Sequence, residues 1–161
     1  MWSVTVSRHI EADLEVVYEH FTSPSEEKRL DLHADHVRRY RELDRGPDHL
    51  EYDFTFQAFG MRFYGKGRED FERLERSILQ VQEGVLRGAR IELLFEAEGA
   101  GTRVTQVTAF PERVLGIIKQ FFGRLLEARV RAITAVHLDE HKRDIEGLSP
   151  GRDNTPGEVR S

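Results

Sequence analysis

The stretch PERVLGIIKQFFGRLLEARVRAITAVHLDEHKRDIEG covers residues 111–147 and predicts one long amphipathic helix from Glu112 to about Ile145. At about 100° per residue, its apolar side chains fall on one broad stripe. The stripe consists of Val114, Leu115, Ile118, Phe121, Phe122, Leu125, Leu126, Ala132, Ile133 and Val136. Arg129 lies near the middle, where a core helix normally carries an apolar residue. A stripe of this length requires a large apolar partner.

Strand-like segments in the first two thirds of the chain supply that partner. In residues 2–10 apolar and polar side chains alternate, which is the period of two of a strand with one buried face. Further segments with strand character cover 37–44, 48–58, 61–73, 77–83, 89–98 and 102–110. The connections between the later segments are short and mostly rich in glycine, as in hairpins. We therefore predict seven strands in one antiparallel sheet.

Helical spacing appears once between the first two strands. Residues 11–23, EADLEVVYEHFTS, place apolar side chains on one helical face, and the Ser23-Pro24 pair ends the helix. Residues 25–36 are polar and weakly helical, so we expect a short second helix or a loop there.

The alternation also predicts which side chains turn inward, toward the long helix. These are Leu50, Tyr52, Phe54, Phe56 and Ala58; Met61, Phe63, Gly65 and Gly67; Ile91, Leu93, Phe95 and Ala97; and Val104, Gln106, Thr108 and Phe110. Gly65 and Gly67 have no side chain where a filled core would have one. Gln106 and Thr108 place polar groups on an apolar surface, where an unpaired group costs about 1–3 kcal/mol. An internal cavity that holds water or a ligand would explain both features.

The order of these elements predicts an α+β fold in which a curved seven-stranded antiparallel sheet wraps around a long C-terminal helix. One or two short helices follow the first strand. We expect a single domain over residues 1–146 and a flexible tail over residues 147–161, which are rich in glycine and proline.

The chain resembles the START-like (SRPBCC) superfamily of helix-grip proteins. The resemblance rests on the opening VTVSRHIEADLEVVYEHFTS (residues 4–23), on the hairpin FEAEGAGTRVTQVT (residues 95–108) and on the long helix after Pro111, and it covers about residues 2–145. The superfamily includes polyketide cyclases, coenzyme Q binding proteins, lipid-transfer domains and the birch-pollen allergen. It implies a deep, mostly apolar cavity between sheet and terminal helix, but no single activity.

Composition excludes several functional classes. With 39% hydrophobic and 33% charged residues, the chain is typical of a globular domain, and no apolar run approaches the roughly 20 residues of a membrane-spanning helix. The net charge of −5 argues against nucleic acid as a partner, and we interpret the basic cluster Arg38, Arg39 and Arg41 as the solvated side of a strand. The absence of cysteine and of a signal-peptide pattern predicts a cytoplasmic protein. The oligomeric state does not follow from the sequence.

Two histidine motifs are possible metal sites. HLDEH at 137–141 has the H-x-x-E-H spacing of an inverted zinc-protease motif, but no third ligand is evident, and we interpret it as a solvated helix face. DLHADH at 31–36 combines imidazoles and carboxylates that can bind zinc, and such clusters are common in polar connectors. We therefore predict no metal and no cofactor.

Arg129 is the most specific single candidate for a functional residue. Its spacing from Leu125 and Ile133 directs it toward the sheet, where an unpaired guanidinium is costly. It either acts inside the cavity, where it binds an anionic or carbonyl-bearing ligand or organises the polarity of the pocket, or it forms a structural salt bridge or extends to the cavity mouth. Arg129→Leu is expected to fold in both cases and to lose ligand binding only in the first.

The expected function is binding or transport of a small hydrophobic molecule such as a lipid, quinone or polyketide. The expected cavity lining consists of Tyr52, Phe54, Phe56, Phe63, Phe95, Gln106, Thr108, Ile118, Phe122, Leu125 and Arg129. The same residues are compatible with an enzyme of polyketide cyclase or aromatase type, although no catalytic triad or phosphate-binding loop is readable. A protein-interaction module that assists a chaperone is the third alternative.

Overall fold

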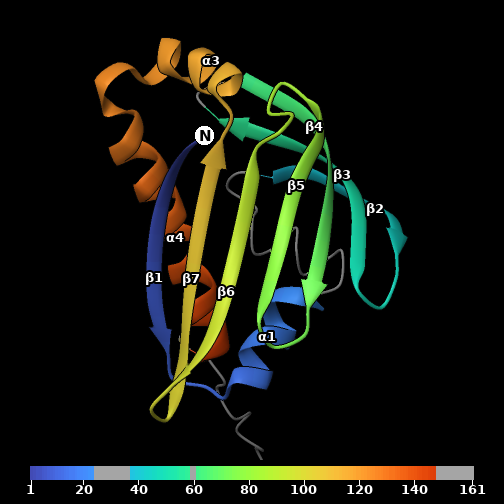
Figure 1. Ribbon diagram of the computed structural model, residues 1–161, viewed down its shortest axis with the longest axis vertical. Coiled ribbons are helices and arrows are strands. Elements are labelled where there is room, and N and C mark those ends of the chain that lie inside the picture. The colour runs from blue at the N-terminus through green and yellow to red at the C-terminus, as the bar shows by residue number, and fades with distance from the viewer. Residues whose placement is uncertain (24–36, 59–60, 148–161) are drawn as a thin grey trace, which may run out of the picture.

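The computed structural model describes residues 1–23, 37–58 and 61–147, which form a curved sheet with helices on its inner side (Figure 1). In chain order the elements are β1 (Trp2–Ile10), α1 (Leu14–Thr22), β2 (Val37–Arg45), β3 (His49–Ala58), β4 (Met61–Glu72), β5 (Arg76–Gly84), β6 (Arg90–Glu98), β7 (Gly101–Phe110), α3 (Glu112–Phe122), the 3-10 helix η1 (Gly123–Leu125) and α4 (Leu126–Ile145). The segment 25–36, with its possible metal ligands, and the tail after residue 147 lie outside the described residues.

The predicted fold class is confirmed. All seven predicted strands are present, with ends within one residue of the prediction, and they form one antiparallel sheet in the order β1-β7-β6-β5-β4-β3-β2. Six of the strands follow one another as hairpins, and β1 pairs with β7 along its whole length, from Trp2 opposite Phe110 to Ile10 opposite Thr102. The described residues contain no helix that is long and apolar enough to cross a membrane.

The prediction of one uninterrupted terminal helix is wrong. Gly123 ends α3 with φ 54° and ψ −131°, a backbone conformation that glycine adopts without the steric penalty of a Cβ atom. The short η1 follows, and α4 then runs behind β1 and β7 in a new direction (Figure 1).

The break also changes which side of α4 is buried. Its buried residues are Leu126, Val130, Thr134, Leu138 and His141. Four members of the predicted stripe are exposed instead: Leu125 (59%), Val136 (46%), Ile133 (36%) and Ala132. The predicted stripe assumed a constant angle per residue along one helix. Because the 3-10 turn shifts the helical phase, the buried positions of α4 come about one residue later than predicted.

The apolar interior consists of two clusters. The larger one joins β1, β6, β7, α1 and the terminal helices, and its fully buried members are Val4, Ile10, Val17, Val104 and Leu138. The smaller one lies across β2 and β3 and contains Tyr40, Leu50 and Tyr52, with Phe54, Phe71 and Leu79 packed against it. The terminal helices α3 and α4 therefore pack on one side of the inner face. The other side has an apolar cluster of its own.

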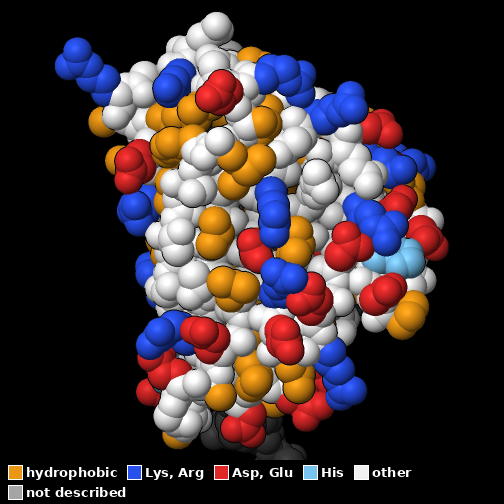
Figure 2. All heavy atoms as spheres, viewed as in Figure 1, with side chains coloured by type: hydrophobic (Ala, Val, Ile, Leu, Met, Phe, Trp, Pro, Cys, Tyr) orange, Lys and Arg blue, Asp and Glu red, His pale blue; other side chains and the backbone are white. Residues whose placement is uncertain are grey.

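The outer face of the sheet is charged. Figure 2 shows acidic and basic side chains intermixed over this face. Typical contacts are those of Glu51, which lies 3.0 Å from Arg68 and 3.5 Å from Lys66 on β4. Each surface pair of this kind contributes about 0–1 kcal/mol of stability. Together their charges keep this face of the sheet in contact with solvent.

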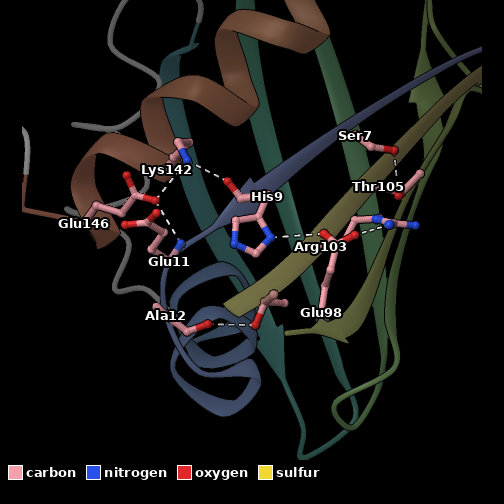
Figure 3. A network of polar contacts seen from close by, with 10 residues as sticks. Ser7, His9, Glu11, Ala12, Glu98, Arg103, Thr105, Lys142 and Glu146 are labelled. Carbon is pink, nitrogen blue, oxygen red and sulfur yellow. Dashed lines mark hydrogen bonds and ion pairs between the residues drawn. The ribbon is translucent and has the colours of Figure 1, made fainter. Parts of the chain in front are cut away.

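The C-terminal end of α4 is fixed to the end of β1 by a small polar network (Figure 3). Lys142 donates to the backbone carbonyl of His9 at 2.6 Å and to Glu146 at 3.0 Å. Glu146 also accepts a 2.9 Å hydrogen bond from the backbone N–H of Glu11. The Glu11 amide, and after it Lys142, lower the pKa of the Glu146 carboxyl below its ordinary value.

This network predicts the effect of Glu146→Gln. Removal of the charge weakens both hydrogen bonds, so we expect the free energy of unfolding at pH 7 to fall by about 1 kcal/mol. Because the pKa of Glu146 is lowered in the folded state, its contribution is complete above about pH 4.5 and disappears as the pH falls through the folded-state pKa. Chemical denaturation at pH 7 and pH 3 measures the difference between wild type and variant at each pH.

The control is Glu127→Gln, which removes the carboxylate of another i, i+4 pair on the same helix, with Arg131. Glu127 is 63% exposed, so its removal is expected to change stability by less than about 0.5 kcal/mol. Equal effects of the two variants would contradict the anchoring role of Glu146.

Candidate functional site

Aromatic side chains cover the inner face of β2, β3 and β4. We call Tyr40, Tyr52, Phe54, Phe56 and Phe63 the aromatic wall. The ring centroids of Tyr40 and Tyr52 are 4.7 Å apart, those of Tyr52 and Phe54 5.9 Å, and those of Phe56 and Phe63 6.2 Å. The sequence prediction that aromatic rings from these strands gather on one face is therefore confirmed.

The aromatic wall is only partly covered. Tyr40 and Tyr52 are buried, whereas Phe54, Phe56 and Phe63 are half-buried. The helix α4 packs mainly on β1, at the opposite edge of the sheet, and α1 packs on β6 and β7. The rings of the wall thus keep apolar surface that the described helices leave accessible.

One flank of α4 faces this uncovered part of the sheet. Arg131 donates to the carbonyl of Thr5 and Lys142 to that of His9, so these two residues mark the flank that faces β1. Ile133 lies about 160° around the helix from Arg131. It therefore projects away from β1, over the inner face in the direction of β6 to β2.

Arg129 lies on that flank, and it is exposed rather than turned into the core. The predicted orientation toward the sheet is therefore wrong, because it assumed the unbroken helix. The exposed Val136 and the half-buried Glu140 lie about two and three helical turns further along α4. The flank combines apolar and charged side chains opposite the aromatic wall, and whether Arg129 contacts a ligand stays a prediction.

The other predicted lining residues are divided. Phe95 belongs to the main core, where Tyr18 and Phe21 contact its ring at centroid distances of 5.3 and 5.6 Å. Ile118 packs against that core from α3, and Leu125 is exposed in η1. The side chain of Phe122 lies outside the described side chains.

The two glycines of β4 make room for side chains of the protein itself. A Cβ atom on Gly65 would lie 2.6 Å from Cζ of Phe54, and one on Gly67 would lie 2.8 Å from Cδ1 of Leu79. The Phe54 ring thus lies over Gly65. We expected a cavity above these glycines, and neighbouring side chains occupy that space instead.

Gly65→Ala is therefore expected to displace the Phe54 ring and to lower stability by about 1–3 kcal/mol, because overpacking strains a close contact. The control is Gly116→Ala in α3, where a Cβ atom meets nothing within 4 Å. Alanine in an exposed helix interior is expected to raise stability by about 0.5–1 kcal/mol. Thermal denaturation of both variants measures whether each substitution lowers or raises stability. Unchanged stability of Gly65→Ala would show that the Phe54 ring moves without an energetic cost.

Gln106 and Thr108 are buried, with 4% and 6% exposure, and they are hydrogen-bonded within the protein. The amide nitrogen of Gln106 donates to Thr108 at 3.2 Å, and Thr108 lies 3.4 Å from the hydroxyl of Thr134 on α4. The amide oxygen of Gln106 lies 2.8 Å from Nδ1 of His137. The polar groups that the sequence assigned to a cavity thus connect β7 with α4.

From Gln106 the hydrogen bonds continue through three histidines. Nε2 of His137 lies 3.1 Å from Nε2 of His141, and Nδ1 of His141 lies 3.1 Å from Nε2 of His20 on α1. His20 Nε2 is also 3.5 Å from a carboxylate oxygen of Asp144. We call His20, His137 and His141 the histidine chain. It joins α1, α4 and β7 inside the molecule.

The partner at one end fixes the direction of the histidine chain. Because the amide oxygen of Gln106 only accepts, Nδ1 of His137 carries a proton and donates. In the neutral rings Nε2 of His137 then accepts from Nε2–H of His141, and Nδ1 of His141 accepts from Nε2–H of His20. Each ring donates to the next in the same sense.

The interpretation of HLDEH as a solvated helix face is wrong for His141, which is 4% exposed, and for its partner His137, which is half-buried. The spacing of four residues was the available signal, but the partner His20 comes from a distant helix and cannot be read from it. In the part of the chain that the structure describes, no group of three or more His, Cys, Asp or Glu side chains has the arrangement of a metal site.

Sequence reasoning missed Glu69, which is 5% exposed on the inner face. It lies between Leu50 and Leu79 in the register of the sheet and accepts a hydrogen bond from Ser77. The alternation that placed Gly65 and Gly67 inward extends to Glu69, so two more residues of the same pattern would have found it. Burial raises the pKa of the nearby Tyr18 phenol, and the Glu69 carboxylate adds to this increase.

Comparisons with known proteins give relatives by structure but not by sequence. No protein-family model matches the chain, and no curated protein matches it. TTHA0849 from Thermus thermophilus is similar with a TM-score of 0.71 at 19% identity, over 92% of this chain and 99% of that one. The Zhui aromatase/cyclase from Streptomyces sp. R1128 has a TM-score of 0.58 at 14% identity, over 89% and 95%.

The di-domain aromatase/cyclase StfQ of the steffimycin biosynthetic pathway is similar with a TM-score of 0.65 at 13% identity. The similarity covers 90% of this chain and 51% of StfQ. Identities this low show the fold and leave the activity open. The fold is the START-like helix grip that the sequence resembles.

Proposed function

We propose that this protein binds a small hydrophobic molecule, such as a lipid, a quinone or a polyketide, between the aromatic wall and the flank of α4 that carries Arg129. The observation that supports the proposal most is the incomplete cover of the wall. Phe54, Phe56 and Phe63 are half-buried, and the exposed Ile133 lies on the facing helix flank. Burial of this surface provides about 25 cal/mol per Å² before the costs of association.

The wall also explains which class of ligand fits. Aromatic faces offer apolar area with little loss of conformational entropy, and they do not select a hydrogen-bonding pattern. We expect Arg129, on the α4 flank that borders the site, to contact the polar end of an amphipathic ligand. Such a site orients a molecule with an apolar body and one polar end.

Phe63→Ser tests the site. Loss of the ring removes apolar contact worth about 1.5–3 kcal/mol when fully buried, so we expect the Kd of a fluorescent hydrophobic probe, anilinonaphthalene sulfonate, to rise about tenfold or more. The control is Tyr64→Ser, which removes an aromatic ring from the next residue of β4. Tyr64 is 55% exposed on the outer face and should leave the Kd unchanged. Equal affinities of the two variants would place the probe elsewhere.

The natural ligand is identified by extraction. The purified protein is denatured, and the organic extract is compared by mass spectrometry with that of Phe63→Ser prepared in parallel. We expect one apolar compound at a ratio near one per wild-type chain and a depleted signal from the variant. Identical extracts would count against retention of a ligand at the wall.

A second candidate function, polyketide cyclisation, has one specific observation in its favour. The buried carboxyl group of Glu69 lies on the inner face next to the wall, where a bound chain would meet it. A carboxylate there is able to remove a proton from the carbon between two carbonyl groups, and the resulting carbanion attacks a carbonyl of the same chain to form a carbon–carbon bond. The alkoxide takes the proton back from the Glu69 carboxyl group, and loss of water then gives the aromatic ring. Positioned acid–base groups accelerate such steps by about 10²–10⁴-fold.

Glu69→Gln distinguishes the two functions. A cyclase is expected to lose about 100-fold in the rate of aromatic product formation from a synthetic poly-β-ketothioester, with binding of the hydrophobic probe retained. A pure carrier gives no protein-dependent product in either form. Absorbance of the aromatic product measures the rate, and unchanged turnover in the variant would remove Glu69 from the reaction.

A further inference from the structure

We propose that the histidine chain is a proton-sensitive latch, which holds α1 on α4 when its rings carry at most one net positive charge and releases this contact when they carry more. The proposal does not depend on any ligand. It rests on the two imidazole contacts, on the burial of His141 and on the position of the chain between two helices.

The contact between α1 and α4 depends strongly on these rings. His20 is the residue of α1 that hydrogen-bonds to α4, through His141. Phe21 supports this contact, because its ring lies over His141 with centroids 4.2 Å apart. The other aromatic contacts of α1, from Tyr18 and Phe21, go to Phe95 on β6. Loss of the histidine contacts would therefore separate α1 from α4 without detaching it from the sheet.

The number of protons that the closed latch can hold follows from its geometry. Each of the two N···N contacts, at 3.1 Å, has room for one hydrogen atom. His137 carries one more on Nδ1, toward Gln106, and His20 is able to carry one on Nδ1. The three rings of the closed latch therefore hold at most four N–H hydrogens. Three neutral imidazoles hold three, so the closed latch carries at most one positive charge. A second charge places two hydrogens in one contact and breaks it.

The charged groups that face the latch stabilise the first added proton. They do not change the limit of one added proton in the closed state. Among the described residues of α4, the facing carboxylate is that of Asp144, 3.5 Å from His20. From β7 the facing groups are the uncharged Gln106 and Thr108, and from α1 the facing side chain is that of Phe21. One positive charge has a partner among these groups, whereas three charges in a buried cluster repel one another.

The released histidines can each take a proton, with ordinary pKa values of about 6.5, so the open state binds up to two protons more than the closed state. The equilibrium constant for opening therefore rises as the pH falls. Well below about pH 6.5 the increase approaches 100-fold per pH unit. The latch is closed at neutral pH and opens in acid.

Hydrogen exchange of the α1 amides between pH 7.5 and 5, corrected for intrinsic exchange, tests the latch. In wild type we expect protection of α1 to fall with a slope that approaches two protons, while the amides of β6 and β7 stay protected. His141→Gln keeps an amide that can hydrogen-bond but removes the central titrating ring, so its slope should fall from about two protons to about one. The matched control, His49→Gln, removes a histidine that contacts Asp44 and Asp48 at a distant turn, and it should keep the wild-type slope.

Nitrogen NMR of the imidazoles in the unmutated protein provides a test that requires no variant. At pH 8 we expect His141 to be protonated on Nε2 and not on Nδ1. Protection of α1 that is unchanged at pH 5 while all three rings become charged would overturn the proposal. So would a stoichiometric divalent metal on these nitrogens in the purified protein, because the rings would then not be free to titrate.

Discussion

The difference in width between one helix and seven strands determines how this molecule is built. Strands lie about 4.8 Å apart, so the sheet is roughly 30 Å wide, whereas a helix with its side chains measures about 10–12 Å. Among the described elements, the terminal helix α4 packs on β1 and no helix packs on the strands at the other edge. On those strands a second apolar cluster forms around Tyr40, Leu50 and Tyr52. The uncovered aromatic surface next to that cluster is the basis of the proposed ligand site.

The inner face is also divided by polarity. Where α4 lies close to β7, Gln106, Thr108 and the histidine chain form a continuous series of hydrogen bonds, so buried polar groups are paired rather than exposed to a ligand. Where α4 does not reach, aromatic rings dominate, and the buried carboxylate of Glu69 lies beside them on the inner face. The proposed ligand binding and the proposed proton-dependent docking thus use different halves of the same face. Either property can change without the other.

Similarity to TTHA0849, Zhui and StfQ establishes the fold over about nine tenths of the chain. Proteins that share a helix-grip scaffold differ in which side chains line its interior, so function depends on the site and not on the scaffold. In this chain the proposed site combines apolar rings with a buried carboxylate beside them. That combination suits a hydrophobic ligand, and it permits acid–base chemistry only if the ligand brings an acidic C–H group to Glu69.

The sequence by itself determined the seven strands, their antiparallel pairing and the inward set of aromatic residues, because a period of two and short turns are local properties of the chain. It also indicated the terminal helix, but not the change of phase at Gly123, which moved Arg129 and Ile133 out of the core. The pairing of His20 with His141 connects residues 121 positions apart. Only the tertiary structure decided it, because such a contact depends on how two helices dock and no local pattern encodes that geometry.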